Sequence, residues 1–144
     1  LTIYGFFSTN STVARPPAEH PTPAELEILQ VLWDRRSGTV RDVMTTLDAT
    51  RPRAYTTVMS LMNLMADKGL LRRRRDGRAY VYAPGVRRDT TLQRIVGDLV
   101  NRAFDGSASA LVSNLLDHAR PDREELEEIH RIISRFHKNK RGEP

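Results

Sequence analysis

The stretch from residue 55 to residue 84 limits the fold of this chain most, because its periodicity changes from helical to strand-like at one glycine. Apolar residues recur at helical spacing from Val58 to Met65, which predicts an amphipathic helix that packs through one face. Gly69 follows as the residue expected just after a helix C-terminus. Two short segments then flank Asp76-Gly77, a dipeptide that favours a two-residue hairpin turn. The sequence therefore predicts a helix followed directly by a β-hairpin, which ends near Pro84.

The polar face of this helix carries short hydrogen-bonding side chains, and the hairpin carries a cluster of arginines. Such side chains can reach base edges in a major groove, and arginines can pair with phosphates. Residues 51–78 hold eight Arg or Lys residues against two Asp, while the whole chain has a formal net charge of only +5, so positive charge is concentrated here. The predicted DNA-binding residues are Arg51, Arg53, Tyr55, Thr56, Thr57, Ser60, Asn63, Arg72, Arg73, Arg74, Arg75 and Arg78.

Within this set, we expect the helix side chains to select the DNA sequence and the arginines to bind the backbone. Strand alternation places half of the hairpin arginines on each side, so about two or three are expected to reach phosphate at once. The alternatives are a solvated helix face and a charged sheet edge. For Tyr55, the alternative is packing against the first helix.

Two further helices are predicted before the polar helix. Thr22, Pro23 and Glu25 form a capping-box start for the first, and Thr39 with Asp42 starts the second. The residues assigned to the core are Leu26, Leu29, Val31, Leu32, Trp33, Val40, Val43, Met44 and Leu47, together with Tyr80 and Tyr82 of the hairpin. Three helices followed by a hairpin predict a winged helix-turn-helix domain over residues 22–85, after a flexible extension over residues 1–21.

Residues 86–138 show helical periodicity throughout and are predicted to form three amphipathic helices, the second starting at Ser107 and the third at a capping box of Asp122 and Glu125. Three short helices cannot bury so many apolar side chains by themselves, so self-association is expected. The predicted fold is thus mainly α with a small β-hairpin wing: a winged helix-turn-helix domain, a three-helix dimerisation tail and a basic segment over residues 139–144. The expected dimerisation residues are Ile95, Leu99, Leu111, Leu115, Leu126, Ile129 and Ile133.

Several classes of protein are disfavoured by what the sequence lacks. The chain contains no cysteine, which excludes disulfides, thiolate metal sites and cysteine nucleophiles and fits a cytoplasmic protein. No apolar run approaches the roughly 18 residues of a membrane span, so no membrane insertion is expected. His130 and His137 are more widely spaced than a chelating pair, and we expect neither a metal site nor another cofactor. No catalytic constellation is apparent, so an enzyme is not expected.

Four segments resemble, in this order, the penicillinase repressor family: PTPAELEILQVLW, TVRDVMTTL, AYTTVMSLMNLMADKGLL and DGRAYVYAP. The tail segment GSASALVSNLL is similar too, so the resemblance covers about residues 22–137. It implies a homodimeric repressor that binds a palindromic double-stranded DNA operator, with half-sites like TACA and TGTA, through two winged helices. It also implies a β-lactam or cell-envelope response in which a membrane sensor peptidase leads to cleavage of the tail between Asn114 and Leu115.

Two positions depart from the family's pattern. Leu64 stands where the family usually has an arginine late in the polar helix. Leu115 replaces the phenylalanine of the family's usual Asn-Phe scissile pair. The lack of cysteine also excludes the cysteine-rich tail of the more distant copper-responsive repressors. Two other functions remain open: a winged-helix activator or architectural DNA-binding protein, and a protein-interaction module. Steep salt dependence with sequence preference would exclude the module, and overlap with a promoter's polymerase site would separate repression from activation.

Overall fold

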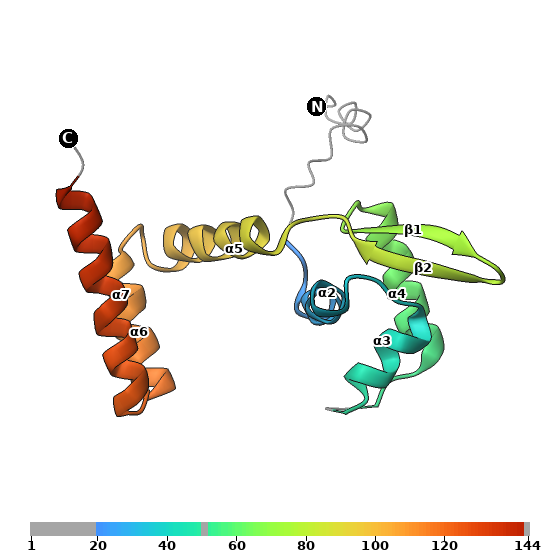
Figure 1. Ribbon diagram of the computed structural model, residues 1–144, viewed down its shortest axis with the longest axis horizontal. Helices are drawn as coiled ribbons and strands as arrows, with labels where there is room; N and C mark the ends of the chain where they lie inside the picture. Colours follow the sequence, from blue (N-terminus) through green and yellow to red (C-terminus); the bar gives the residue numbers. More distant parts are fainter. Residues whose placement is uncertain (1–19, 50–51, 143–144) are drawn as a thin grey trace, which may run out of the picture. The chain divides into compact units, whose positions relative to one another are not determined.

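The computed structural model describes residues 20–49 and 52–142, which belong to two compact units that divide between Ile95 and Val96. The predicted extension up to residue 19 and the predicted DNA contact Arg51 lie outside the described residues. The first unit contains α2 (Pro23–Arg35), α3 (Val40–Leu47), α4 (Tyr55–Asp67), β1 (Leu71–Asp76), β2 (Ala79–Pro84) and the start of α5 (Arg88–Ala103) (Figure 1). The second contains the rest of α5, α6 (Ala108–Ala119) and α7 (Arg123–Arg141).

Helices α2 and α3 begin at reciprocal capping boxes. The Thr22 hydroxyl accepts a hydrogen bond from the Glu25 backbone N–H at 3.2 Å, and the Glu25 carboxylate accepts from the Thr22 N–H at 2.9 Å. Thr39 and Asp42 form the same pair of bonds at 3.1 and 2.9 Å. The bond from Thr39 is also the main reason that the pKa of Asp42 is lowered. Both predicted helix starts are confirmed, because each box satisfies two backbone donors that a helix leaves free.

The core of the first unit lies between α2, α3 and α4 and is closed by the strands. Ile28 is fully buried although it was not among the predicted core residues, whereas Leu26 is only partly buried. The buried stripe of α2 runs through Glu25, Ile28, Leu29 and Leu32 at helical spacing, which leaves Leu26 at its edge. The buried apolar residues are Ile28, Leu29, Val31, Leu32, Val40, Val43, Leu47, Val58, Met62, Met65, Leu70, Leu71 and Tyr82.

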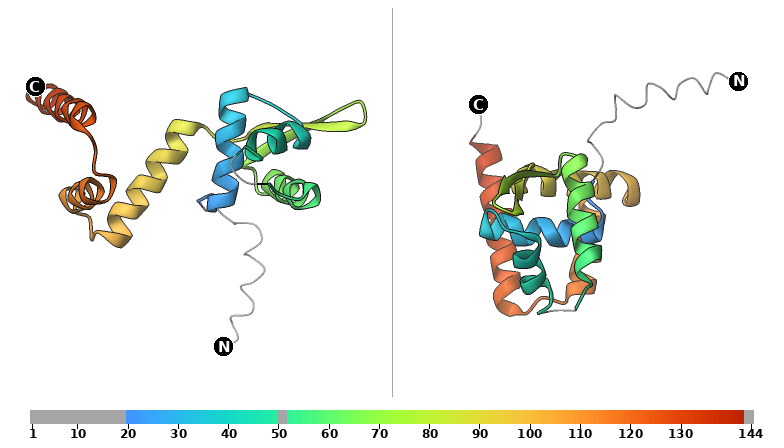
Figure 2. Two further views of the ribbon diagram at one scale, coloured as in Figure 1. Left: turned by 90° about the horizontal axis from the view of Figure 1, so that it is seen from below. Right: turned by 90° about the vertical axis from the view of Figure 1, so that its right-hand side faces the viewer.

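The hairpin of β1 and β2, which we call the wing, extends away from α2, α3 and α4 (Figure 2). Asp76 pairs with Ala79, so the turn consists of Gly77 and Arg78 rather than the predicted Asp76-Gly77. Gly77 has a φ of 68°, and a type II′ turn takes glycine at its first central position. The positive φ thus shifts the turn by one residue and places Arg78 at the tip.

Backbone contacts fasten the base of the wing to the helices. Gly38, between α2 and α3, exchanges two backbone hydrogen bonds with Tyr82 at 2.9 and 2.8 Å. Gly85 lies so close to the end of α4 that a Cβ atom there would be 2.4 Å from the Gly69 carbonyl oxygen. Any larger residue at position 85 would displace the backbone at the wing exit. The base of the wing is therefore fixed from two directions.

A buried ion pair links the first turn of α2 to the end of α4. The Glu25 side chain is 2% exposed, and its second carboxylate oxygen lies 2.7 Å from Lys68 Nζ, just beyond the end of α4. Glu25 therefore serves both the capping box of α2 and the contact with α4. A carboxylate buried to this degree requires such partners, because desolvation without them is costly.

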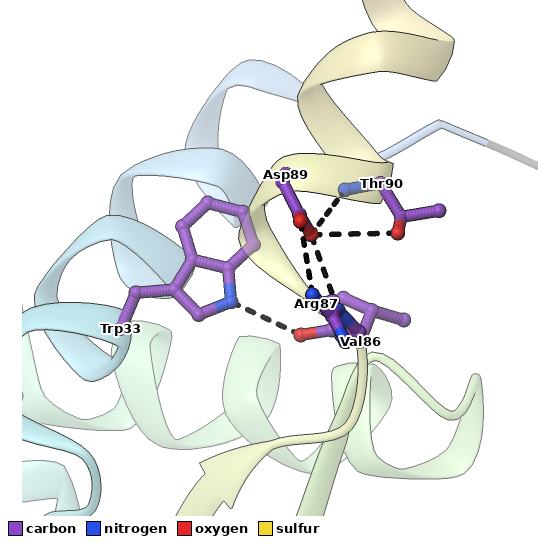
Figure 3. Close-up of polar contacts among 5 residues, drawn as sticks. All are labelled: Trp33, Val86, Arg87, Asp89 and Thr90. Atoms are coloured by element: carbon purple, nitrogen blue, oxygen red, sulfur yellow. Dashed lines mark hydrogen bonds and ion pairs between the residues drawn. The ribbon is translucent and has the colours of Figure 1, made fainter.

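The first turn of α5 is held against α2. The Trp33 indole N–H donates to the Val86 carbonyl oxygen at 3.0 Å, and the Arg88 guanidinium lies over the indole ring, 5.6 Å from its centroid. Figure 3 shows the indole beside the start of α5, where the Asp89 carboxylate accepts from the Thr90 N–H and pairs with Arg87. That pairing lowers the pKa of Asp89. The predicted packing role of Trp33 is confirmed, although the ring is only partly buried.

The second unit consists of amphipathic helices with little mutual packing. The Ser107 hydroxyl accepts from the Ala110 N–H at 3.0 Å and begins α6, and Asp122 accepts from the Glu125 N–H at 2.9 Å and begins α7. Within the described residues, neither α6 nor α7 contains a buried side chain. No helix in residues 20–49 or 52–142 is long and apolar enough to cross a membrane.

Candidate nucleic-acid interface

We call α4 the recognition helix. Its outward face carries the predicted polar side chains. Val58, Met62 and Met65 are buried, which turns the opposite side of the helix to solvent. The predicted contacts Tyr55, Thr56, Thr57 and Ser60 are exposed, and Asn63 is partly buried. Leu64 is 50% exposed on the same side. The face thus offers hydroxyl groups for base edges, with the Asn63 amide and one apolar side chain among them.

The strand register divides the wing arginines between two faces. Directly paired residues in an antiparallel ladder lie on the same face of the sheet. One face carries Arg73, Arg75, Tyr80 and Tyr82. The other carries Arg72, Arg74, Val81 and Ala83. The predicted division of the arginines between the two faces is therefore confirmed. Arginines lie beside tyrosines on one face and beside small apolar residues on the other.

The first face contacts the recognition helix. Arg73 Nη1 donates to Asn63 Oδ1 at 2.8 Å, and the Tyr82 hydroxyl donates to the same oxygen at 2.7 Å. Burial raises the pKa of the Tyr82 phenol, so the hydroxyl remains protonated. Tyr80 is exposed and lies between Arg73 and Arg75, whose guanidinium carbons are 5.3 and 5.4 Å from its ring centroid. The core role predicted for Tyr80 is wrong, because the residue is too near the wing tip to reach the core.

The second face leaves its cations available. Arg72 and Arg74 line a cavity of about 320 Å³ together with Ser37. Among the described residues, neither guanidinium has a hydrogen-bond or ion-pair partner, and the same holds for Arg78 in the turn. Free guanidinium groups on an exposed hairpin suit contacts with phosphate.

A cleft of about 450 Å³ lies between α3, the recognition helix and β2. Arg41 lies over the Tyr55 ring, 5.4 Å from its centroid, and both line the cleft with Arg78 and Asn63. Arg41 was not among the predicted DNA-binding residues. The sequence nevertheless contained a signal for a functional role of Arg41. A cation in the first turn of a helix is unfavourable to the helix dipole, which indicates that the residue serves a purpose other than helix stability.

Arg53 is held inside the domain. Its Nη2 atom lies 2.9 Å from the Glu27 carboxylate, the side chain is 15% exposed, and its backbone N–H donates to Asp48 at 3.3 Å. The predicted phosphate contact of Arg53 would have to compete with Glu27.

Apolar side chains remain exposed along the helices after the wing. Of the residues predicted for dimerisation, Ile95, Leu111 and Ile129 are partly buried within the protomer. The remaining four are exposed: Leu99, Leu115, Leu126 and Ile133. Four further exposed apolar residues were not among the predicted dimerisation residues, namely Val96, Val112, Ile132 and Phe136. Asn114 and Leu115 lie inside α6, and Leu115 is 50% exposed in the protomer.

Similarity to known proteins extends over most of the chain. The chain is 28% identical to the "Penicillinase repressor" of Bacillus licheniformis over 120 residues, which cover 83% of this chain and 93% of that protein. It is 36% identical to the "Transcriptional regulator BlaI" of Mycobacterium tuberculosis over 100 residues, 68% of this chain and 72% of that protein. It is 19% identical to the "Methicillin resistance regulatory protein MecI" of Staphylococcus aureus over 112 residues, 78% and 91% of the two chains.

A solved structure is similar to part of the chain. The solution structure of the DNA binding domain of the repressor BlaI is 29% identical, covers 46% of this chain and 80% of that one, and has a TM-score of 0.43. The family model described as penicillinase repressor matches residues 21–135. This chain therefore belongs to the penicillinase repressor family.

Proposed function

We propose that this protein is a transcriptional repressor that binds palindromic operator DNA as a homodimer. The observation that carries the proposal is the pairing of a polar recognition helix with a wing whose Arg72 and Arg74 are unpaired among the described residues. Hydroxyl groups suit base edges, and free guanidinium groups suit phosphates. The names of its relatives, which are repressors and regulators, agree with this chemistry.

The second part of the proposal is that the tail holds two copies together. Leu115, Leu126 and Ile133 are exposed in the protomer, and among the described residues α6 and α7 bury no side chain of their own. A second copy of the chain would cover these apolar side chains with the same side chains of its own tail. The two-fold symmetry of such a dimer matches that of a palindromic DNA site. Each DNA-binding unit then raises the effective concentration of the other at its half-site.

The third part concerns release. Cleavage between Asn114 and Leu115 would interrupt α6 and separate the paired DNA-binding units without altering the recognition helix. A helical segment must unwind before it can enter the active site of a protease. Local opening of α6 therefore has to precede cleavage. A membrane sensor peptidase that responds to β-lactam is the proposed origin of the signal.

The experiment measures binding to a duplex with TACA and TGTA half-sites spaced about 10 bp or a multiple apart, and to a duplex with mutated half-sites. Thr57→Ala should lower the discrimination between the two duplexes by about 1–3 kcal/mol if Thr57 contacts a base. Arg74→Ala should weaken binding to both duplexes alike and flatten the salt slope by about one unit per half-site. Arg123→Ala is the matched control, since its side chain is exposed on α7. Binding that is equally tight to both duplexes would refute sequence-specific repression.

A further inference from the structure

The side-chain amide of Asn63 has a fixed orientation. Its oxygen accepts from Arg73 Nη1 at 2.8 Å and from the Tyr82 hydroxyl at 2.7 Å. A guanidinium has donors only, so the atom that faces it must be the amide oxygen rather than the nitrogen. The amide nitrogen, which can only donate, therefore faces away from the wing. We call Asn63, Arg73 and Tyr82 the wing-docking contact.

Tyr82 connects this contact to the rest of the domain. Its side chain is 2% exposed, and its backbone exchanges two hydrogen bonds with Gly38 ahead of α3. Its hydroxyl reaches the recognition helix at Asn63. One residue of the wing is therefore bonded to the segment before α3 and to α4. A change at either bond would alter how the wing is held.

Arg73 is bound on two sides. One side of its guanidinium donates to Asn63, and the Tyr80 ring lies 5.3 Å away. An arginine held in this way loses side-chain freedom and orders the strand that carries it. The unpaired Arg72 and Arg74 are its immediate neighbours in β1, so their positions depend on the same contact.

We propose that Asn63 is a positioning residue that docks the wing on the recognition helix and fixes the wing arginines for contact with the DNA backbone. Bidentate recognition of adenine by asparagine requires both the amide oxygen and the amide nitrogen. The oxygen is already occupied, so Asn63 does not recognise adenine in this way. The inference rests on the proposed DNA-binding function and changes the role expected for Asn63 from base contact to wing positioning.

The test uses the full chain with Asn63→Ala, Tyr82→Phe and the double substitution. Tyr80→Phe is the matched control, because it removes the same atom from the same strand at a hydroxyl without a hydrogen-bond partner among the described residues. Each single substitution should weaken binding to the operator duplex and to the mutated duplex by the same factor, about three- to tenfold per half-site. The double variant should bind no more weakly than Asn63→Ala, since both changes break one contact.

A second measurement follows the wing in the protein without DNA. NMR relaxation of the backbone amides over residues 71–84 should show a more mobile wing in Asn63→Ala and Tyr82→Phe, with the helical circular dichroism unchanged. Asn63→Asp keeps acceptor oxygens for Arg73 and Tyr82 and should restore the order of the wing. This rescue separates docking from a general loss of stability.

Two results would overturn the inference. The first is a change in the preferred half-site sequence with Asn63→Ala but not with Tyr82→Phe, which would make Asn63 a base contact. The second is a wing that stays equally ordered in every variant. A wild-type chain that failed to bind the operator while its variants lost wing order would refute the proposed function and support the docking role.

Discussion

Replacing Ile133 with aspartate should separate the proposed dimer. Ile133 is 56% exposed in the protomer and lies on the apolar stripe of α7 that also contains Leu126 and Ile129. Full burial of an isoleucine side chain contributes about 1.5–3 kcal/mol, so covering the exposed half contributes about 1 kcal/mol. In a two-fold dimer the substitution occurs twice, which removes about 2 kcal/mol, or a factor of about 30 in Kd. Desolvating the new carboxylates adds about 2 kcal/mol or more.

The dimer Kd should therefore rise by about a thousandfold in Ile133→Asp, as measured by sedimentation equilibrium over a range of concentrations. Ser134→Asp is the matched control, because it places the same charge at the next position, on the polar side of the same helix. Circular dichroism should show that α7 stays helical in both variants. An unchanged dimer in Ile133→Asp would mean that this stripe of α7 is not the interface.

Three further predictions follow from other parts of the chain. Leu64→Arg should tighten binding to the operator and to unrelated duplexes alike and steepen the salt slope by about one unit per half-site; an unchanged slope in a filter-binding titration would contradict a backbone contact at this position. Lys68→Met should lower the free energy of unfolding in urea by about 1–3 kcal/mol, because it leaves the buried Glu25 carboxylate without its cation, and Glu25→Gln in the same chain should recover part of the loss. In cells treated with a β-lactam, mass spectrometry should find fragments that end at Asn114 and begin at Leu115; an intact chain during full derepression would argue for a ligand-binding or titration mechanism instead.

Local signals in the sequence predicted the helix starts and most of the core. Thr22 and Thr39 were identifiable because a capping box needs only two side chains three residues apart. The turn of the wing was misplaced by one residue, because Asp76-Gly77 and Gly77-Arg78 both suit two-residue turns and strand pairing decides between them. Tyr80 was assigned to the core because alternation gives the face of a residue but not its distance from the helices.

The candidate site was predictable in composition and less so in the roles of its residues. Residue types located the polar helix and the basic hairpin. They could not show that Asn63 faces the wing or that Arg53 is paired with Glu27, since both contacts join residues from different elements. Arg41 had a signal in its place in the first turn of a helix, but its contact with Tyr55, from the next helix, could not be predicted. Roles that depend on a tertiary contact require the structure.

The contact between α2 and the start of α5 contains an intrinsic fluorophore. Trp33 is the only tryptophan of the 144 residues, and its indole N–H is bonded to Val86 beneath the cation of Arg88. Indole emission moves to longer wavelength when the ring is hydrated, and it responds to a nearby charge. Any event that releases the first turn of α5 will therefore change the fluorescence of the unlabelled protein.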